Sequence, residues 1–169
     1  MPRLIALAVS VGVLAVVATW LFGLPQLIAM KLQVWQAFVA WGCHYHSGGK
    51  FTGTRNTAVC MSFGAVVGVG AALLIPQLGS LGVYAAPVAV GLGATLIVLV
   101  SALPLLGTIP ASVYGFAVVF ALILLGTGMT PTAALVPTIL SVLIGAAFGF
   151  VSEIVAGVLT AKTVVPAAA

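Results

Sequence analysis

The residues best suited to chemistry stand together in the run WGCHYHS, residues 41–47, which is the densest polar cluster of a very apolar chain. On a helix Trp41, His44 and Tyr45 share one face, because side chains three and four positions apart are neighbours, whereas His46 points away. Aromatic walls with a few hydrogen-bonding groups are typical of a narrow solute path. The alternative is an interfacial belt, in which Trp and Tyr anchor the helix among lipid headgroups.

The same run does not predict a metal site. Cys43 and His46 share a helix face, but two ligands fall short of the three or four that zinc needs, and adding Cys60 or Glu153 would be speculative. The two cysteines of the chain are too few for a disulfide scaffold and are expected to be buried free thiols. We therefore expect no metal and no other cofactor.

A weaker polar stripe follows later in the chain. Thr108, Ser112 and Gly115 are spaced i, i+4, i+7 on a helix, and Tyr114-Gly115 is an aromatic-glycine pair like that at residues 41–42. These hydroxyls could hydrogen-bond a neutral solute, or they could bond the carbonyls of their own helix, which is their commoner fate. The candidate pore-lining residues are therefore Trp41, His44, Tyr45, Thr108, Ser112 and Tyr114.

Glu153 is the only acidic residue of the chain, and an ionisable group within a membrane span is a functional candidate by default. It is expected at about the same depth in the membrane as Arg55. A structural ion pair between the two would satisfy both charges, and a proton-coupling or gating role for Glu153 is the alternative.

Several classes of protein are excluded. A single acid cannot supply a serine, histidine and acid constellation, and the chain has neither a phosphate-binding glycine loop nor a haem spacing, so we do not expect an enzyme. No basic stripe is present that could meet a nucleic-acid backbone.

Composition predicts an integral membrane protein. Hydrophobic residues make up 63% of the 169 residues and charged residues 4%, and the mean hydropathy is +1.39. Such a chain lacks the polar residues that cover a water-soluble domain. Runs that are apolar on every face exclude a transmembrane β-barrel, whose strands alternate in polarity, and favour helices.

The pattern predicts an all-α fold, a polytopic membrane bundle of six transmembrane helices. The second span is short for a full crossing and ends in Gly48-Gly49, so we expect it to be tilted or broken. The six expected spans cover residues 4–24, 34–47, 56–74, 84–103, 109–125 and 137–161.

Charge placement predicts the topology. With six crossings Arg3, Lys50, Arg55 and Lys162 fall on one side, and Lys31 alone falls opposite. The positive-inside rule then places both termini in the cytoplasm of a multi-pass protein of the inner (plasma) membrane.

The segment at residues 11–25 recurs in muted form at residues 90–104, which indicates an internal duplication within one membrane domain. A half of three spans is inverted relative to the other, so we expect inverted repeats at 1–80 and 81–169. Two glycine pairs, each four apart, occupy corresponding places: Gly64 with Gly68, and Gly145 with Gly149. This spacing is typical of closely packed helices, within the bundle or between subunits.

The short second span with FVAWGC and a Gly-Gly break, the glycine-rich third span and the fifth span with PASVYGFAVVFA resemble the YcdZ-like family of small bacterial inner-membrane proteins. That family is classed as of unknown function, so the resemblance implies no role for any residue. In architecture the chain is also similar to the urea and amide channels and the acetate channels, which are short six-span subunits that assemble into rings.

Together these features favour a homo-oligomeric channel or facilitator, embedded in the lipid bilayer, for a small neutral or weakly ionised solute. Short amides and carboxylic acids are the expected class, because the scarcity of charge disfavours a fully charged solute. A non-transporting scaffold or accessory subunit, which uses the glycine faces to bind another membrane protein, is the alternative.

Overall fold

A computed structural model describes residues 1–125 and 128–161, and the regular elements in this part of the chain are all helical. In chain order they are α1 (Arg3–Phe22), α2 (Pro25–Ala29), α3 (Val34–His46), α4 (Lys50–Leu74), the 3₁₀ segment η1 (Pro76–Tyr84), α5 (Ala85–Val100), α6 (Ile109–Leu124) and α7 (Pro131–Ala161).

Each predicted span corresponds to one of these helices, but two begin earlier than the sequence analysis expected. Helix α7 begins at Pro131 because Thr130 Oγ1 accepts a hydrogen bond from the Ala133 N–H at 3.3 Å and caps the first turn. Proline is favoured in that turn, and Pro137 is accommodated inside the helix. Helix α4 begins at Lys50 rather than residue 56, for a tertiary reason given below.

Among the described residues, four helices are long and apolar enough to cross a membrane: Arg3–Phe22, Lys50–Leu74, Pro76–Val100 and Pro131–Thr160. Helix α6 has 16 residues and α3 has 13, which is below the roughly 20 residues of a full perpendicular crossing. The chain is therefore a multi-pass membrane protein by helix length and hydropathy.

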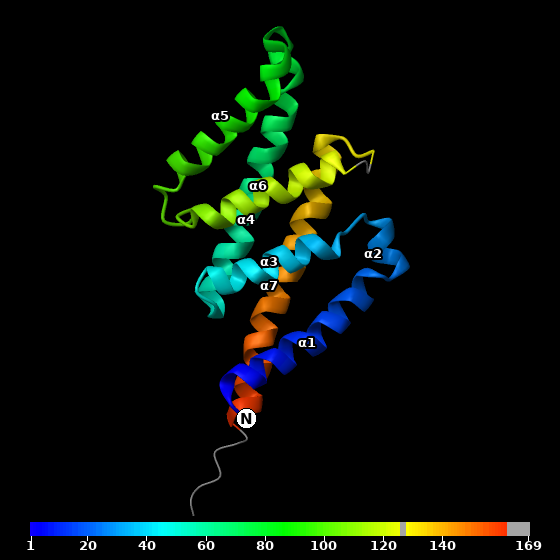
Figure 1. The fold of residues 1–169 in the computed structure, drawn as a ribbon, viewed down its shortest axis with the longest axis vertical. Coiled ribbons are helices and arrows are strands. Elements are labelled where there is room, and N and C mark those ends of the chain that lie inside the picture. Colours follow the sequence, from blue (N-terminus) through cyan, green and yellow to red (C-terminus); the bar gives the residue numbers. More distant parts are fainter. Residues whose placement is uncertain (126–127, 162–169) are drawn as a thin grey trace, which may run out of the picture.

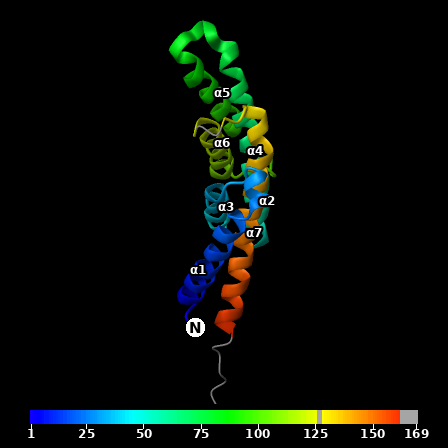
Figure 2. The same cartoon turned by 90° about the vertical axis from the view of Figure 1, so that its right-hand side faces the viewer.

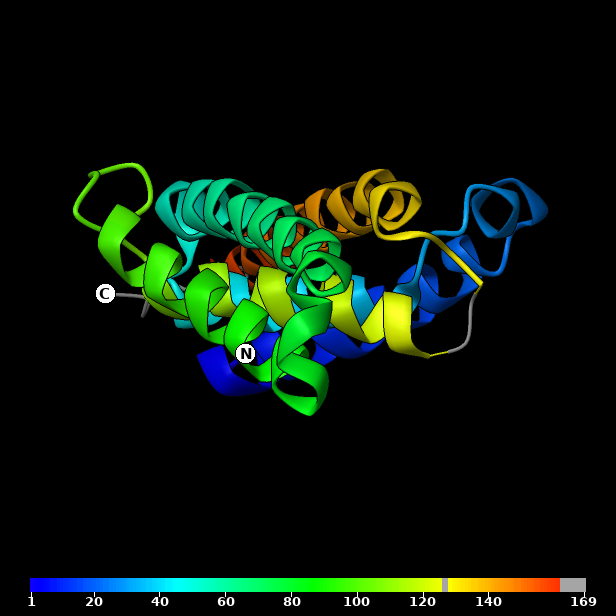
Figure 3. The same ribbon diagram turned by 90° about the horizontal axis from the view of Figure 1, so that it is seen from above.

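The helices form two layers (Figure 3), one with α4 and α7 and the other with α1, α3, α5 and α6. In Figure 1 α4 and α7 follow each other along the long axis and overlap at its middle, where α3 and α6 lie across them. Helix α1 packs on α7 at one end, and α5 packs on α4 at the other. The molecule is thin when seen from the side (Figure 2).

Both glycine pairs lie at contacts between the layers. A Cβ at Gly64 of α4 would stand 1.8 Å from the Ser112 carbonyl oxygen of α6, and one at Gly145 of α7 would stand 2.1 Å from the Ala37 carbonyl oxygen of α3. Gly68 and Gly149 continue these contacts one turn further on. The two helix faces are therefore occupied within the subunit, and they are not free for a second copy.

Candidate functional site

Trp41, His44 and Tyr45 lie on one face of α3, and this face rests on α7. The Trp41 ring stacks on Phe148 with 5.5 Å between ring centroids. Trp41 Nε1 donates to Ser152 Oγ at 3.1 Å, and Tyr45 Oη lies 2.5 Å from the same oxygen. Since Ser152 Oγ donates its own proton to the Gly149 carbonyl at 2.6 Å, it accepts from both aromatic side chains.

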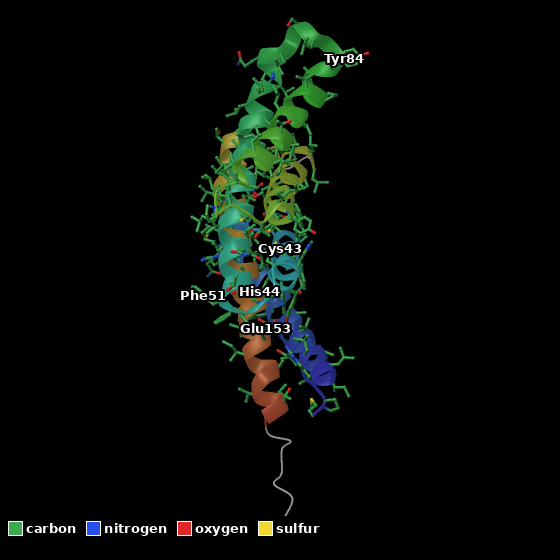
Figure 4. All side chains as sticks on the ribbon, turned by 90° about the vertical axis from the view of Figure 1, so that its left-hand side faces the viewer. Cys43, His44, Phe51, Tyr84 and Glu153 are labelled. Carbon is green, nitrogen blue, oxygen red and sulfur yellow. The ribbon has the colours of Figure 1, made fainter. Side chains whose placement is uncertain are left out.

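His44 is the centre of the polar cluster and is completely buried. Its Nε2 lies 3.0 Å from Glu153 Oε2 of α7, and its Nδ1 lies 3.1 Å from Thr54 Oγ1 of α4. The ring packs flat against the backbone at Gly149, where a Cβ would stand 2.6 Å from the His44 Cγ. His44 therefore joins three helices through one side chain (Figure 4).

Glu153 also holds the first turn of α4. Its Oε2 accepts a hydrogen bond from the Lys50 backbone N–H, the first of the helix. A carboxylate is favoured there because the N-terminal N–H groups of a helix carry partial positive charge. A tight turn leads into the helix, with φ of 97° at Gly48, 65° at Gly49 and 54° at Lys50.

This arrangement corrects two expectations of the sequence analysis. Glu153 is paired with His44 and not with Arg55, whose exposed guanidinium lies 3.3 Å from Asn56 Oδ1. The segment 50–55 is helical because a carboxylate from the far end of the chain caps it, which no local pattern reveals.

The second stripe lies elsewhere in the molecule. Ser112 is buried in α6 against Gly64, and Thr108 stands ahead of the first turn of α6. Tyr114 Oη lies 2.9 Å from Nδ1 of the exposed His46, on the side of α3 away from His44. The structure therefore brings Trp41, His44 and Tyr45 together but separates them from the residues of the second stripe.

Some buried polar atoms have no hydrogen-bond partner in the described part of the chain: Gln36 Oε1, Thr57 Oγ1 and Ser112 Oγ. Gln36, which the sequence analysis missed, donates from Nε2 to the Val118 carbonyl and to Thr138 Oγ1, both at 3.0 Å. These atoms lie on α3, α4 and α6. A glutamine in an otherwise apolar helix stretch was the available signal for this residue. Thr54 and Ser152 were also missed, because single hydroxyls in apolar helices usually bond their own backbone.

Two of the pockets on the described surface lie at the two ends of α1. One, of about 370 Å³, lies between the start of α1 and the end of α7 and is lined by Arg3, Leu7, Glu153 and Ala156 among others. The other, of about 510 Å³, lies at the opposite end of α1 beside Lys31. Neither pocket is lined by any of the six candidate pore-lining residues. Within the described residues no group of three or more His, Cys, Asp or Glu side chains could hold a metal ion.

Fold and site together define an all-α, multi-pass membrane protein with a buried histidine bonded to a partly exposed carboxylate where α3, α4 and α7 meet. Residues 8–157 match the family described as "Protein of unknown function (DUF1097)", and the chain belongs to that family. No curated protein and no solved structure matches the chain.

Proposed function

We propose that this protein is a membrane channel or facilitator for a small neutral or weakly ionised solute, of the short amide or carboxylic acid class. It would be built from two inverted three-helix repeats, 1–80 and 81–169. The observation that carries the proposal is that the two halves make matching contacts. Inverted repeats are a common way to build a solute path at the interface of the two halves.

The matching contacts involve three helices of each half: α1, α3 and α4 in the first, and α5, α6 and α7 in the second. Helix α4 packs on α6 as α7 packs on α3, and α5 packs on α4 as α1 packs on α7. Gly68 meets the Val119 side chain of α6, and Gly149 meets the His44 ring of α3. In Figure 1 α1 and α4 run upwards whereas α5 and α7 run downwards, which is the relation that an inversion requires.

The outer surfaces of α1 and α5 add to this support. A shallow hollow on α1 is formed by Ala15, Val16, Thr19 and Trp20. A hollow on α5 is formed by Ala94, Thr95, Val98 and Leu99. The two sets occupy the same places within the segments 11–25 and 90–104, whose sequences resemble each other.

The solute class follows from the polar groups of the core. Gln36 Oε1, Thr57 Oγ1 and Ser112 Oγ are buried without a partner in the described residues, and buried polar groups normally find one. These uncharged oxygens could accept or exchange hydrogen bonds with a neutral solute or with water. A fully charged solute would find no buried counter-charge beside them.

We further propose that the chain lies in the inner membrane with both termini in the cytoplasm and acts as a homo-oligomer. The N-terminus and the described end of α7 lie at the same end of the molecule in Figure 1. Two layers of helices enclose little space, so a wide path would need a second copy beside the first. Native mass spectrometry in mild detergent tests this, and a monodisperse monomer contradicts it.

The function is tested by uptake into proteoliposomes of urea, acetamide, formate, acetate and glycerol. We expect at least one solute to enter faster than into protein-free liposomes. Thr57→Val should change that rate, because it removes a completely buried hydroxyl while keeping the shape of the side chain. Thr95→Val is the matched control, since Thr95 is exposed on α5 and donates to its own helix at Gly91.

A non-transporting scaffold is the second candidate, and one observation favours it. Trp41, His44 and Ser112 are buried in helix contacts of the subunit and line neither of the two pockets described above. If no solute enters faster than into protein-free liposomes, the channel proposal fails and the scaffold remains. If uptake occurs but Thr57→Val leaves it unchanged, the assignment of Thr57 to the path is wrong.

A further inference from the structure

The Thr54 hydroxyl has a single proton and two acceptors within reach. Its Oγ1 lies 3.1 Å from His44 Nδ1 and 3.0 Å from the Lys50 carbonyl oxygen. On the opposite side of the ring His44 Nε2 faces Glu153 Oε2, which also accepts from the Lys50 N–H. The heavy atoms are therefore fixed, and only the positions of protons are open to change.

With Glu153 ionised, two arrangements of protons satisfy these contacts, and they differ by one proton. In the first His44 is neutral: Nε2–H donates to the Glu153 carboxylate, and Nδ1 accepts from the Thr54 hydroxyl. In the second His44 is an imidazolium: Nδ1–H donates to Thr54 Oγ1, and the Thr54 hydroxyl turns to the Lys50 carbonyl. The Nε2–H to Glu153 bond is kept in both.

We propose that His44, Thr54 and Glu153 form a buried proton-binding site, which takes up one proton at His44 Nδ1 while the Thr54 hydroxyl turns from His44 to the Lys50 carbonyl. The proton comes from water, and no heavy atom has to move. This proposal is independent of the proposed channel function, because the site would bind a proton whether or not the chain conducts a solute.

Few charged or polar groups surround the His44 ring. Tyr45 meets the ring edge on with centroids 5.2 Å apart and is neutral. Lys50 and Arg55 of α4 and Arg3 of α1 have exposed side chains, so water screens their charges. Glu153, the only acid of the chain, bonds the ring directly. Glu153 therefore supplies the counter-charge that a buried imidazolium needs.

Water reaches this site from the pocket between α1 and α7. Glu153 lines that pocket, its side chain is 26% exposed, and Arg3 lines the same pocket. Thr54 is only partly buried on the other side of the ring. In the first arrangement only the acceptor of the His44–Glu153 hydrogen bond is charged, and uptake charges the donor as well, so the bond becomes an ion pair between α3 and α7. Proton uptake therefore tightens the link between α3, α4 and α7 at this end.

The full chain, labelled with ¹⁵N at histidine and held in lipid nanodiscs, provides the test. The chain has two histidines, so the exposed His46 serves as an internal control for the buried His44, and His46→Gln assigns the signals. Spectra are recorded between about pH 5 and pH 8, where histidines change charge. We expect His44 to carry its proton on Nε2 when neutral and to gain the second on Nδ1 as the pH falls.

Two variants separate the proposal from a purely structural role. Glu153→Gln keeps an acceptor for Nε2–H but removes the counter-charge, so the pH dependence of the His44 signals should change while that of the His46 signals should not. Thr54→Val should shift the Nδ1 resonance, and Thr54→Ser should restore it. A neutral His44 with its proton on Nδ1 overturns the proposal. So does a His44 titration that is the same in the wild type and in Glu153→Gln, or an Nδ1 resonance that is the same in the wild type and in Thr54→Val.

Discussion

At the scale of single residues, Glu153, the only acidic side chain of the chain, makes several contacts. Glu153 accepts from His44 Nε2 and from the Lys50 N–H, and it lines the pocket beside Arg3. Each donor would lose its partner if the carboxylate were removed. Losing a buried hydrogen-bond partner costs more than the bond itself contributes, because the remaining group is left without water.

Glu153→Ala should therefore lower the free energy of unfolding by about 1–3 kcal/mol, measured by denaturation in detergent micelles. Arg55→Ala is the control and should change it by less than about 0.5 kcal/mol, as surface substitutions usually do. Equal losses in the two variants, or a strong coupling between them in a double-mutant cycle, would restore the Arg55–Glu153 pair and contradict the observed geometry.

The turn before α4 gives a second prediction at this scale. Gly48 and Gly49 both have positive φ, but a Cβ at Gly48 would meet nothing within 4 Å, whereas one at Gly49 would stand 2.6 Å from Glu153 Oε1. Gly48→Ala should cost only the backbone strain of about 1–2 kcal/mol. Gly49→Ala should cost at least about 1 kcal/mol more because it displaces the carboxylate. Thermal unfolding of the two variants compares them, and equal melting temperatures would count against the role of Glu153 as a cap.

At the scale of elements, the glycines decide how closely helices approach. Gly115 of α6 lies against the Met61 backbone of α4, where a Cβ would stand 1.9 Å from the carbonyl oxygen, and Gly64 makes the reciprocal contact with Ser112. Without side chains on these faces the backbones of α4 and α6 touch, and many small dispersion contacts form along the pair.

Gly64→Ala should destabilise the protein by about 1–3 kcal/mol, because α4 and α6 must separate to admit the methyl group. Gly70→Ala, on the same helix, is the matched control: a Cβ there meets nothing within 4 Å. It should be neutral or stabilising by up to about 1 kcal/mol, since alanine favours helix. Unfolding in detergent measures both, and an equal response of the two variants would show that the α4–α6 contact is looser than described.

At the scale of the whole molecule, the topology depends on which helices cross the membrane. With the N-terminus in the cytoplasm, as we propose, Phe51 lies on the cytoplasmic side and Val83 on the outer side if α3 and α6 cross as well as the four long helices. If only the four long helices cross, the two positions exchange sides. Both side chains are well exposed, at 70% for Phe51 and 84% for Val83, so thiols placed there would react readily.

We expect Phe51→Cys to be labelled by a membrane-impermeant maleimide only in inverted vesicles and Val83→Cys only in intact spheroplasts. This result would agree with the excess of Lys and Arg on the cytoplasmic side. The wild type is the control, because its Cys43 and Cys60 are buried and should remain unlabelled. Labelling of Phe51→Cys from the outside would rule out the six-span topology.

The sequence by itself determined the class of the protein and the approximate place of every long helix. Apolar runs interrupted by Pro25, Pro76 and Pro104 are local signals, and helix formation within a membrane depends mainly on such local composition. The shared face of Trp41, His44 and Tyr45 was also predictable, because the periodicity of a helix is fixed.

Only the tertiary structure decided the partners of these residues. The start of α4 and the pairing of His44 depend on Glu153, which is more than a hundred residues away in the chain. Charge and depth alone favoured Arg55, since sequence gives a residue its height on a helix but not the helix that faces it. The glycine faces are filled by α3 and α6 of the same subunit for the same reason: a small residue permits close approach, and the packing of the whole chain selects which backbone approaches.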